Sequence, residues 1–130
     1  MGKPVRVAIV GLGFVSSAHA TAWRGQKDAE IVAVCDTRLE WARQRCIEYG
    51  ARRAYATFDE VLMDDEINAI DILTPPGLHA PMAIRAAESG RHVLVEKPAC
   101  LSAAEGEAMA EAAKRAGVVM GVAETFVFLT

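Results

Sequence analysis

The residues best suited to chemistry stand at a glycine turn near the start of the chain. Gly11 and Gly13 follow the apolar run 5–10, and a helical pattern begins at Phe14. Gly11 permits a tight turn, and Gly13 lets the backbone approach a pyrophosphate without an intervening Cβ. The expected helix directs its free N–H groups and its positive dipole end at the same phosphates. Asp36 closes a second apolar run and can accept hydrogen bonds from a ribose, so this order of residues predicts a dinucleotide site.

The residues around this motif refine the prediction. Ser16 stands where the third glycine of the motif usually lies, and because serine is small we expect the helix to pack on the strand as before. Asp36 favours NAD, since a carboxylate repels the 2′-phosphate of NADP. Arg38 lies two residues further on and could pair with that phosphate, so NADP remains open. Thr37, between the two, completes the candidate ribose-binding segment.

A second candidate group is the tripeptide Glu96-Lys97-Pro98, which follows the apolar run 92–95. A lysine at a strand end, beside a bound nicotinamide, can hydrogen-bond a substrate hydroxyl or tune proton transfer during hydride transfer. Glu96 could orient the ammonium group, and Pro98 restricts the backbone next to it. The alternative is a surface ion pair at the end of a strand, and the tripeptide alone favours that simpler interpretation.

Strand and helix patterns alternate along the chain and would position both groups. The expected strands cover residues 5–10, 31–36, 53–56, 69–73, 92–96 and 118–123. The expected helices cover residues 14–26, 38–50, 57–62, 80–89 and 102–117. Six strands with intervening helices predict an α/β fold, a doubly wound parallel sheet of the Rossmann type with strand order 3-2-1-4-5-6.

Several helix ends carry capping signals. A Ser or Thr followed three residues later by Glu is the pattern of a capping box. It occurs at Thr37/Glu40, Thr57/Glu60 and Ser102/Glu105. Helical patterns are followed by a glycine, where a left-handed cap is expected, at Gly50, Gly90 and Gly117.

Ligands of such a sheet bind beyond the carboxyl ends of its strands, near the reversal of strand order. The segments at those ends are residues 11–16, 36–38, 74–79 and 96–98. We therefore expect a single site at one edge of the sheet. His79 belongs to this set, whereas for His19, on the first helix, packing or capping is as well supported as ligand contact.

Composition excludes several classes of protein. A chain of 130 residues has the size of one domain, and 52% hydrophobic with 24% charged residues is typical of a globular protein. The net charge of −3 argues against a nucleic-acid partner. Cysteines 35, 46 and 100 lack metal-ligand spacing, so we expect reduced thiols, a cytoplasmic location and no metal. No apolar run is long enough to span a membrane. The N-terminal segment imitates a secretory signal, but its removal would delete the first strand and the glycine turn.

In combination, these motifs resemble the glucose–fructose oxidoreductase / inositol dehydrogenase (Gfo/Idh/MocA) family. The resemblance covers nearly the whole chain and depends on motifs in the family's order. They are Gly11-Leu12-Gly13 with His19, Asp36, Thr74-Pro75-Pro76-Gly77-Leu78-His79 and Glu96-Lys97-Pro98. Members of the family are NAD- or NADP-dependent oxidoreductases of sugars, polyols and related hydroxy compounds.

The resemblance implies site roles for the matched positions. It places Gly11, Gly13, Phe14 and Val15 at the pyrophosphate and Asp36 at the adenosine ribose. With the neighbours at the strand ends, the residues expected to contact the cofactor are Gly11, Gly13, Phe14, Val15, Asp36, Thr37, Arg38, Thr74, Pro75, His79, Glu96 and Lys97. Lys97 is expected beside the nicotinamide and the substrate, as the catalytic residue.

Family members continue into a second α/β domain, which supplies further catalytic residues and usually the oligomer interface. This sequence ends at Thr130, so we expect residues 1–130 to be the dinucleotide-binding domain without that second domain, binding cofactor with little or no turnover. The alternatives are a stand-alone non-catalytic dinucleotide-binding or redox-sensing module and, with less support, a methyltransferase that uses S-adenosylmethionine. The apolar residues 126–129, if exposed, favour a homo-oligomer.

Overall fold

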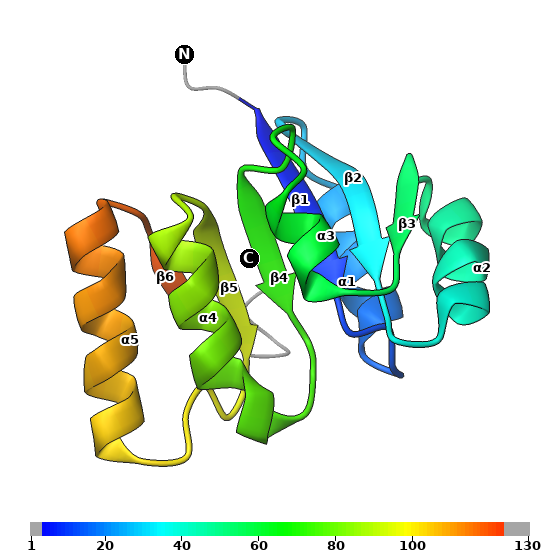
Figure 1. The fold of residues 1–130 in the computed structure, drawn as a ribbon. Coiled ribbons are helices and arrows are strands. Elements are labelled where there is room, and N and C mark those ends of the chain that lie inside the picture. Colours follow the sequence, from blue (N-terminus) through cyan, green and yellow to red (C-terminus); the bar gives the residue numbers. More distant parts are fainter. Residues whose placement is uncertain (1–3, 124–130) are drawn as a thin grey trace.

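The computed structural model describes residues 4–123, in which strands and helices alternate (Figure 1). The strands are β1 (Val5–Val10), β2 (Ala29–Cys35), β3 (Arg53–Tyr55), β4 (Ala69–Ile72), β5 (His92–Glu96) and β6 (Met120–Ala123). The helices are α1 (Ser16–Arg24), α2 (Leu39–Tyr49), α3 (Phe58–Leu62), α4 (His79–Glu88) and α5 (Ala103–Ala116). A 3₁₀ turn, Pro76–Leu78, precedes α4. Every strand and helix predicted from the sequence is present, with ends shifted by a few residues.

The strands form one parallel sheet in the order β3-β2-β1-β4-β5-β6. This confirms the predicted doubly wound architecture, in which the strand order reverses between β1 and β4. Because all strands run in the same direction, the loops that follow them emerge at the same edge of the sheet. The glycine turn after β1, the segment after β2 and the loops after β4 and β5 therefore become neighbours in space.

Helices cover both faces of the sheet and create two apolar cores. Val7 and Ile9 of β1 belong to the core shared with α1 and α2. The alternate residues Ala8 and Val10 belong to the core beneath α3, α4 and α5. Figure 1 shows α4 and α5 in front of the sheet and α1 behind it. Because side chains alternate along a strand, the central strands are apolar on both faces and hold the sheet between two helix layers.

Capping at two helices is confirmed. At the start of α3, Thr57 accepts a hydrogen bond from the N–H of Glu60, and the Glu60 carboxylate accepts one from the N–H of Thr57. At the start of α5, Ser102 accepts a hydrogen bond from the N–H of Glu105. The predicted left-handed glycines also have positive φ angles, at Gly50, Gly90 and Gly117.

The predicted capping box at the start of α2 is wrong. The N-cap residue is Arg38 rather than Thr37, and no side chain caps this helix. Asp36 accepts the hydrogen bond from the Arg38 N–H at 2.9 Å, while Glu40 pairs with Arg43. A Thr37 cap would have to accept from the N–H of Glu40, whereas Asp36 forms a turn with Arg38 and α2 begins one residue later than a Thr37 cap requires.

The starts of α1 and α4 differ from the prediction in opposite directions. α1 starts at Ser16 rather than Phe14, because the glycine turn extends through Val15, the N-cap residue. The amide of Ser16 donates to the carbonyl oxygen of Gly13 at 3.0 Å. α4 starts at His79, one residue earlier than predicted, where the 3₁₀ turn ends.

Two further expectations concern the molecule as a whole. Within residues 4–123, no helix is both long enough and apolar enough to cross a membrane. The same part of the chain brings together no cluster of three or more His, Cys, Asp or Glu side chains suited to a metal ion. Residues 126–129, from which we expect self-association, lie outside the described residues, so that expectation stays a prediction.

Candidate functional site

A cleft of about 790 Å³ opens at the carboxyl ends of β1, β2 and β4, where the strand order reverses. Its volume lies in the range typical of sites for small molecules and cofactors. The lining residues that the sequence predicted are Gly11, Gly13, Asp36, Thr37, Arg38, Thr74 and Pro75. We call residues 10–13 and 35–38 the glycine side of the site, and residues 71–79 with 96–98 the lysine side.

The glycine turn depends on the absence of a side chain at Gly11. This residue has a φ angle of +93°, and a Cβ added to it would lie 2.8 Å from the backbone carbon of Leu73 and the backbone nitrogen of Thr74. The turn after β1 therefore packs directly against the loop after β4. A Cβ at Gly13 would meet no atom within 4 Å, so this position borders open space. Both findings agree with a backbone that is free to approach a ligand.

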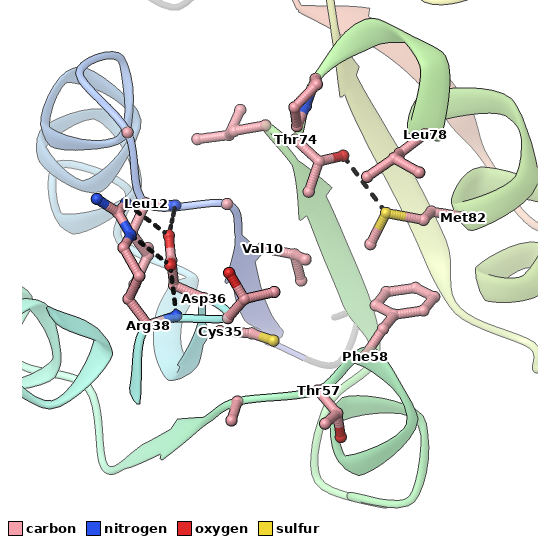
Figure 2. Close-up of a pocket in the computed structure, with 16 residues that line it drawn as sticks. Val10, Leu12, Cys35, Asp36, Arg38, Thr57, Phe58, Thr74, Leu78 and Met82 are labelled. Atoms are coloured by element: carbon pink, nitrogen blue, oxygen red, sulfur yellow. Dashed lines mark hydrogen bonds and ion pairs between the residues drawn. The ribbon is translucent and has the colours of Figure 1, made fainter. Parts of the chain in front are cut away.

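Asp36 is held in place by donors from both segments of the glycine side (Figure 2). Its Oδ2 accepts a hydrogen bond from the Leu12 N–H at 3.0 Å, and its Oδ1 accepts one from the Arg38 Nε at 2.9 Å. Burial alone would raise the pKa of this carboxyl group. The hydrogen bonds from Arg38 and Leu12 outweigh burial and hold the pKa of Asp36 below its usual value. Asp36 is therefore an ionised acceptor attached to the glycine turn.

Ser16 fits the position of the third glycine without disturbing the turn. Its side chain is fully buried, and its Oγ donates to the carbonyl oxygen of Gly13 at 2.8 Å. Since that bond uses the Ser16 proton, the Tyr49 hydroxyl donates to Ser16 Oγ, also at 2.8 Å. The serine therefore connects the glycine turn to α2, a contact that a glycine would lack.

The opposite wall of the cleft is mainly apolar. Phe58 and Leu78 line it, and the Thr74 hydroxyl donates to the Met82 sulfur at 3.4 Å (Figure 2). Cys35 borders the same space, and burial together with the charge of Asp36 raises the pKa of its thiol to about 12. The cleft thus offers flat apolar surface beside one carboxylate and the amides of a glycine turn, which suits a nucleotide. Phe58, Leu78 and Met82 are not among the predicted site residues, because large apolar side chains at or near helix starts resemble ordinary core residues in a sequence.

The remaining predicted residues do not line this cleft. Phe14 is fully exposed at the glycine turn, and Val15 is half-buried. Glu96 ends β5, and the exposed Lys97 follows it, joined to Pro98 by a cis peptide bond. The contacts of these residues with a cofactor stay predictions.

His79 also lies apart from the cleft surface. Its side chain is 1% exposed, at the start of α4. Its Nδ1 lies 2.8 Å from the carbonyl oxygen of Pro98, and its Nε2 lies 2.5 Å from that of Thr74. The ring therefore connects the loop after β4 to the loop after β5, and its predicted contact with a cofactor is not tested by this geometry.

A buried polar array behind the lysine side was not recognised from the sequence. His19 of α1 donates from Nδ1 to Asp71 and from Nε2 to Glu96, both at 2.7 Å. Trp23 Nε1 donates to the same oxygen of Asp71 at 2.8 Å. Asp71 and His19 are 0% and 1% exposed. The available signal was a carboxylate inside the apolar strand Ala69–Ile72, a position where a charge needs a partner.

His19 is charged in this array. Burial alone would lower the pKa of the imidazole, but the hydrogen bonds and negative charges of Asp71 and Glu96 outweigh burial and raise the pKa above its usual value. Since both ring nitrogens face carboxylate oxygens, which accept hydrogen bonds, the array favours the ring that donates from both nitrogens.

Comparison with known proteins identifies relatives over nearly the whole chain. D-apiose dehydrogenase of Paraburkholderia graminis is 36% identical over 124 residues, which are 95% of this chain and 33% of that protein. The scyllo-inositol 2-dehydrogenase (NAD(+)) of Bacillus subtilis is 37% identical over 123 residues, 94% of this chain and 36% of that protein. The chain thus spans about a third of the length of the curated relatives it matches.

Solved structures show the same relation. GenD2 from gentamicin A biosynthesis, crystallised with NAD, superimposes with a TM-score of 0.88 at 34% identity, covering 94% of this chain and 35% of that one. The WlbA dehydrogenase of Bordetella pertussis, crystallised with NADH and UDP-GlcNAcA, gives a TM-score of 0.86 at 34% identity, covering 92% of this chain and 37% of that one.

The family model that matches describes an oxidoreductase family with an NAD-binding Rossmann fold, and it covers residues 5–124. Those residues include the whole sheet, the glycine turn and both sides of the site. The match, the identities to the curated relatives and the shared fold agree with the resemblance seen in the motifs. The chain therefore belongs to the Gfo/Idh/MocA oxidoreductase family and carries its NAD-binding Rossmann domain.

Proposed function

We propose that this chain binds NAD in the cleft and serves as the cofactor-binding part of an oxidoreductase that acts on a hydroxyl group of a sugar, polyol or related compound. The observation that carries the proposal is the attachment of the ionised Asp36 to the glycine turn through the Leu12 N–H. It brings the ribose acceptor and the pyrophosphate-binding backbone into one surface. The names of the matched relatives, a D-apiose and a scyllo-inositol dehydrogenase, support the substrate class.

The residues present fit the cofactor. Gly13 borders open space where a backbone must approach a pyrophosphate, and the N-terminus of α1 directly follows it. Asp36 would accept hydrogen bonds from the ribose hydroxyls. Thr74 and Pro75, on the opposite wall, would contact the remainder of the cofactor. Phe14 and Val15 would add their amides to the pyrophosphate site.

Lys97 is the residue to which we assign proton transfer. When bound, the nicotinamide group supplies hydride-transfer chemistry. The Lys97 side chain would hydrogen-bond the substrate oxygen. As a neutral amine it would accept the proton that a hydroxyl loses on oxidation, and as an ammonium it would return that proton to the carbonyl oxygen on reduction. Glu96, next to it in the chain, would keep a negative charge near this position. Efficient turnover also requires a substrate held in a fixed orientation, and the chain spans about a third of the length of the dehydrogenases it matches. We therefore expect cofactor binding without appreciable turnover by this chain alone.

We further propose a preference for NAD over NADP. The Asp36 carboxylate stays ionised and would repel a 2′-phosphate. Arg38, the nearest positive group, donates through Nε and through its second guanidinium nitrogen to the two oxygens of Asp36, at 2.9 and 3.0 Å. A 2′-phosphate would therefore have to compete with Asp36 for the same guanidinium.

Calorimetric titration of this chain with NADH, NADPH, ADP-ribose and S-adenosylmethionine tests the proposal. We expect binding of NADH and ADP-ribose, weaker binding of NADPH and none of S-adenosylmethionine. The variant Asp36→Ala should lose affinity for ADP-ribose, whereas Asp59→Ala, an exposed carboxylate on α3, should not. Binding of S-adenosylmethionine alone, or of neither nicotinamide cofactor, would contradict the assignment, and steady-state oxidation of a polyol by this chain would contradict the expected inactivity.

A further inference from the structure

The two residues that flank Lys97 in the chain are each bonded to a buried histidine. Glu96 accepts a hydrogen bond from His19 Nε2 at 2.7 Å. The carbonyl oxygen of Pro98 lies 2.8 Å from His79 Nδ1. His19 and His79 are two of the three histidines in the sequence, and each is 1% exposed. Lys97 therefore lies between two attachments to the protein interior.

Each histidine uses its other ring nitrogen to reach β4 or the loop after it. His19 donates from Nδ1 to Asp71 within β4, and His79 bonds through Nε2 to the carbonyl oxygen of Thr74. Thr74 lines the cleft, and Asp71 lies three residues before it. Both rings thus connect the end of β5 to β4 and the loop after it, which forms one wall of the cleft.

The two attachments come from opposite faces of the sheet. His19 lies on α1, and Glu96 shares its side of β5 with Leu94, opposite to the core residues Val93 and Val95. His79 begins α4, which packs on the other face. A loop held from both faces has fewer ways to shift than a loop held from one. The lysine that follows β5 is therefore restrained in both directions perpendicular to the sheet.

The hydrogen-bond chemistry of both rings favours a fixed geometry. Two carboxylates accept from His19, which donates from both nitrogens. Two carbonyl oxygens face His79, and carbonyl oxygens only accept hydrogen bonds. A ring with one N–H donates to one of the two oxygens that face His79, and rotating either ring away from its acceptors would break a hydrogen bond of a buried side chain, which costs free energy.

We propose that His19 and His79 act as a pair of positioning residues for Lys97, holding its neighbours Glu96 and Pro98 to the wall of the cofactor cleft. This inference rests on the proposed function, because the position of Lys97 matters for a cofactor and substrate at that wall. A merely structural role for the two histidines would affect the stability of the fold but would not be transmitted specifically to Lys97.

The first test observes Lys97 directly and needs no cofactor. The chain contains four lysines, so labelling their Cε atoms with carbon-13 gives few signals, and Lys97→Arg identifies the one from Lys97. We expect this signal to shift by more than its linewidth in His19→Gln and in His79→Gln, while the Lys114 signal on α5 stays in place. His92→Gln is the matched control, because His92 is exposed at the opposite end of the same strand and accepts only from the Val119 N–H.

If His19→Gln does not fold, a second variant can take its place in this test. Asp71→Asn keeps the size of the side chain and one oxygen acceptor, and Asp71 is joined through His19 to Glu96, the neighbour of Lys97 in the chain. We expect it to move the Lys97 signal in the same direction as His19→Gln, by a smaller amount. An unchanged Lys97 signal in folded His79→Gln and in folded His19→Gln or Asp71→Asn would overturn the proposal.

The second test asks whether the histidines act through Lys97 on the cofactor. We expect His79→Gln to weaken NADH binding roughly three- to tenfold while leaving ADP-ribose binding unchanged, because ADP-ribose lacks the nicotinamide. In the Lys97→Ala background the same substitution should have no further effect on NADH binding, since residues that act through one another give non-additive changes. Additive losses, or equal losses for both ligands, would contradict the positioning role. Absence of binding by the unmodified chain would instead contradict the proposed function and leave the lysine signals to decide the inference.

Discussion

On the glycine side of the site, Asp36 is held by Arg38, two residues away, and by one amide of the neighbouring turn. The Arg38 side chain is 59% exposed. On the lysine side, His19 reaches Asp71 and Glu96, which are 52 and 77 residues away in the sequence, and is 1% exposed. Both sides pair carboxylates with cationic side chains, yet Asp36 pairs with an exposed guanidinium, whereas His19 and Asp71, behind the lysine side, are almost fully buried.

This difference separates two tasks of a binding site. The partly exposed bonds of the glycine side can be exchanged for bonds to a ligand at small cost, because water already competes for them. The hydrogen bonds of the buried Asp71 to His19 and Trp23 are shielded from water. Breaking one therefore leaves an unpaired charge or donor in the core. We infer that the glycine side adapts to the ligand, while the lysine side supplies a rigid frame.

The largest effect should follow from removing the buried carboxylate. Asp71→Ala removes the acceptor that the His19 Nδ1–H and the Trp23 N–H share, and we expect it to lower the free energy of unfolding by about 3–5 kcal/mol. Urea denaturation measures this. Glu30→Ala on β2, which removes an exposed strand carboxylate, should cost less than about 1 kcal/mol. Similar losses in the two variants would refute the contrast between the two sides.

On the glycine side, we expect Gly11 to contribute to stability and Gly13 to contribute to binding. Gly11→Ala places a Cβ against the backbone of Leu73 and Thr74 at a positive φ angle, and should lower the free energy of unfolding by about 2–4 kcal/mol. Gly13→Ala meets open space, so its stability should stay near that of the unmodified chain, while NADH affinity falls by about tenfold. Thermal unfolding measures the stability of both variants, and calorimetric titration measures their affinity for NADH. If Gly13→Ala binds NADH normally, the pyrophosphate site is misplaced.

The charge on His19 should make stability depend on pH. The pKa of His19 is raised in the folded protein, so its contribution is complete below the unfolded pKa, near about 6.5. It is lost as pH rises through the higher pKa of the folded state, because deprotonation removes one of the two donors. We expect the free energy of unfolding to decrease with rising pH between the unfolded and the folded pKa of His19, to level off above the folded one, and to lack this decrease in His19→Gln. His92→Gln should keep it, and a decrease shared by all three proteins would assign it to another group.

The relative affinity for NADH and NADPH tests whether the bonds between Asp36 and Arg38 can be exchanged for bonds to a ligand. Asp36→Ser removes the charge that repels a 2′-phosphate and releases the Arg38 guanidinium, so the ratio of NADPH to NADH affinity should rise by about tenfold or more. Parallel calorimetric titrations give this ratio. Adding Arg38→Ala should reverse most of the gain. A ratio that is the same in all variants would mean that Asp36 does not contact the ribose.

The smallest effect concerns the helix cap beside the cleft. Thr57→Ala breaks the capping box at α3 and should lower the free energy of unfolding by about 1 kcal/mol. Thr37→Ala, at the capping box that does not form, should change it by less than about 0.3 kcal/mol, since its side chain caps no helix. Equal losses at the two positions would restore the capping role that the sequence predicted for Thr37.

The correct and incorrect predictions follow the distance between interacting residues. Thr57 and Glu60, like Ser102 and Glu105, lie three residues apart and meet wherever a helix begins, so their capping was predictable. Thr37 does not cap α2, because Arg38 is the N-cap residue and its N–H is bonded to Asp36, whose position depends on where the glycine turn lies in space. For His79, the sequence did not predict the contact with the Pro98 carbonyl oxygen, because the two residues lie 19 positions apart in the chain.

The order of strands and helices, the glycine turn and the acidic residue Asp36 at a strand end could all be predicted from the sequence alone. These features follow from apolar periodicity, from the backbone freedom of glycine and from short spacings. The buried array of His19, Asp71 and Glu96, and the contact between His79 and the Pro98 carbonyl oxygen, became visible only in the folded structure. Those contacts join strands and helices that become neighbours only when the parallel sheet assembles, and the free energy of burying charge then leaves each group a single arrangement in which it is paired.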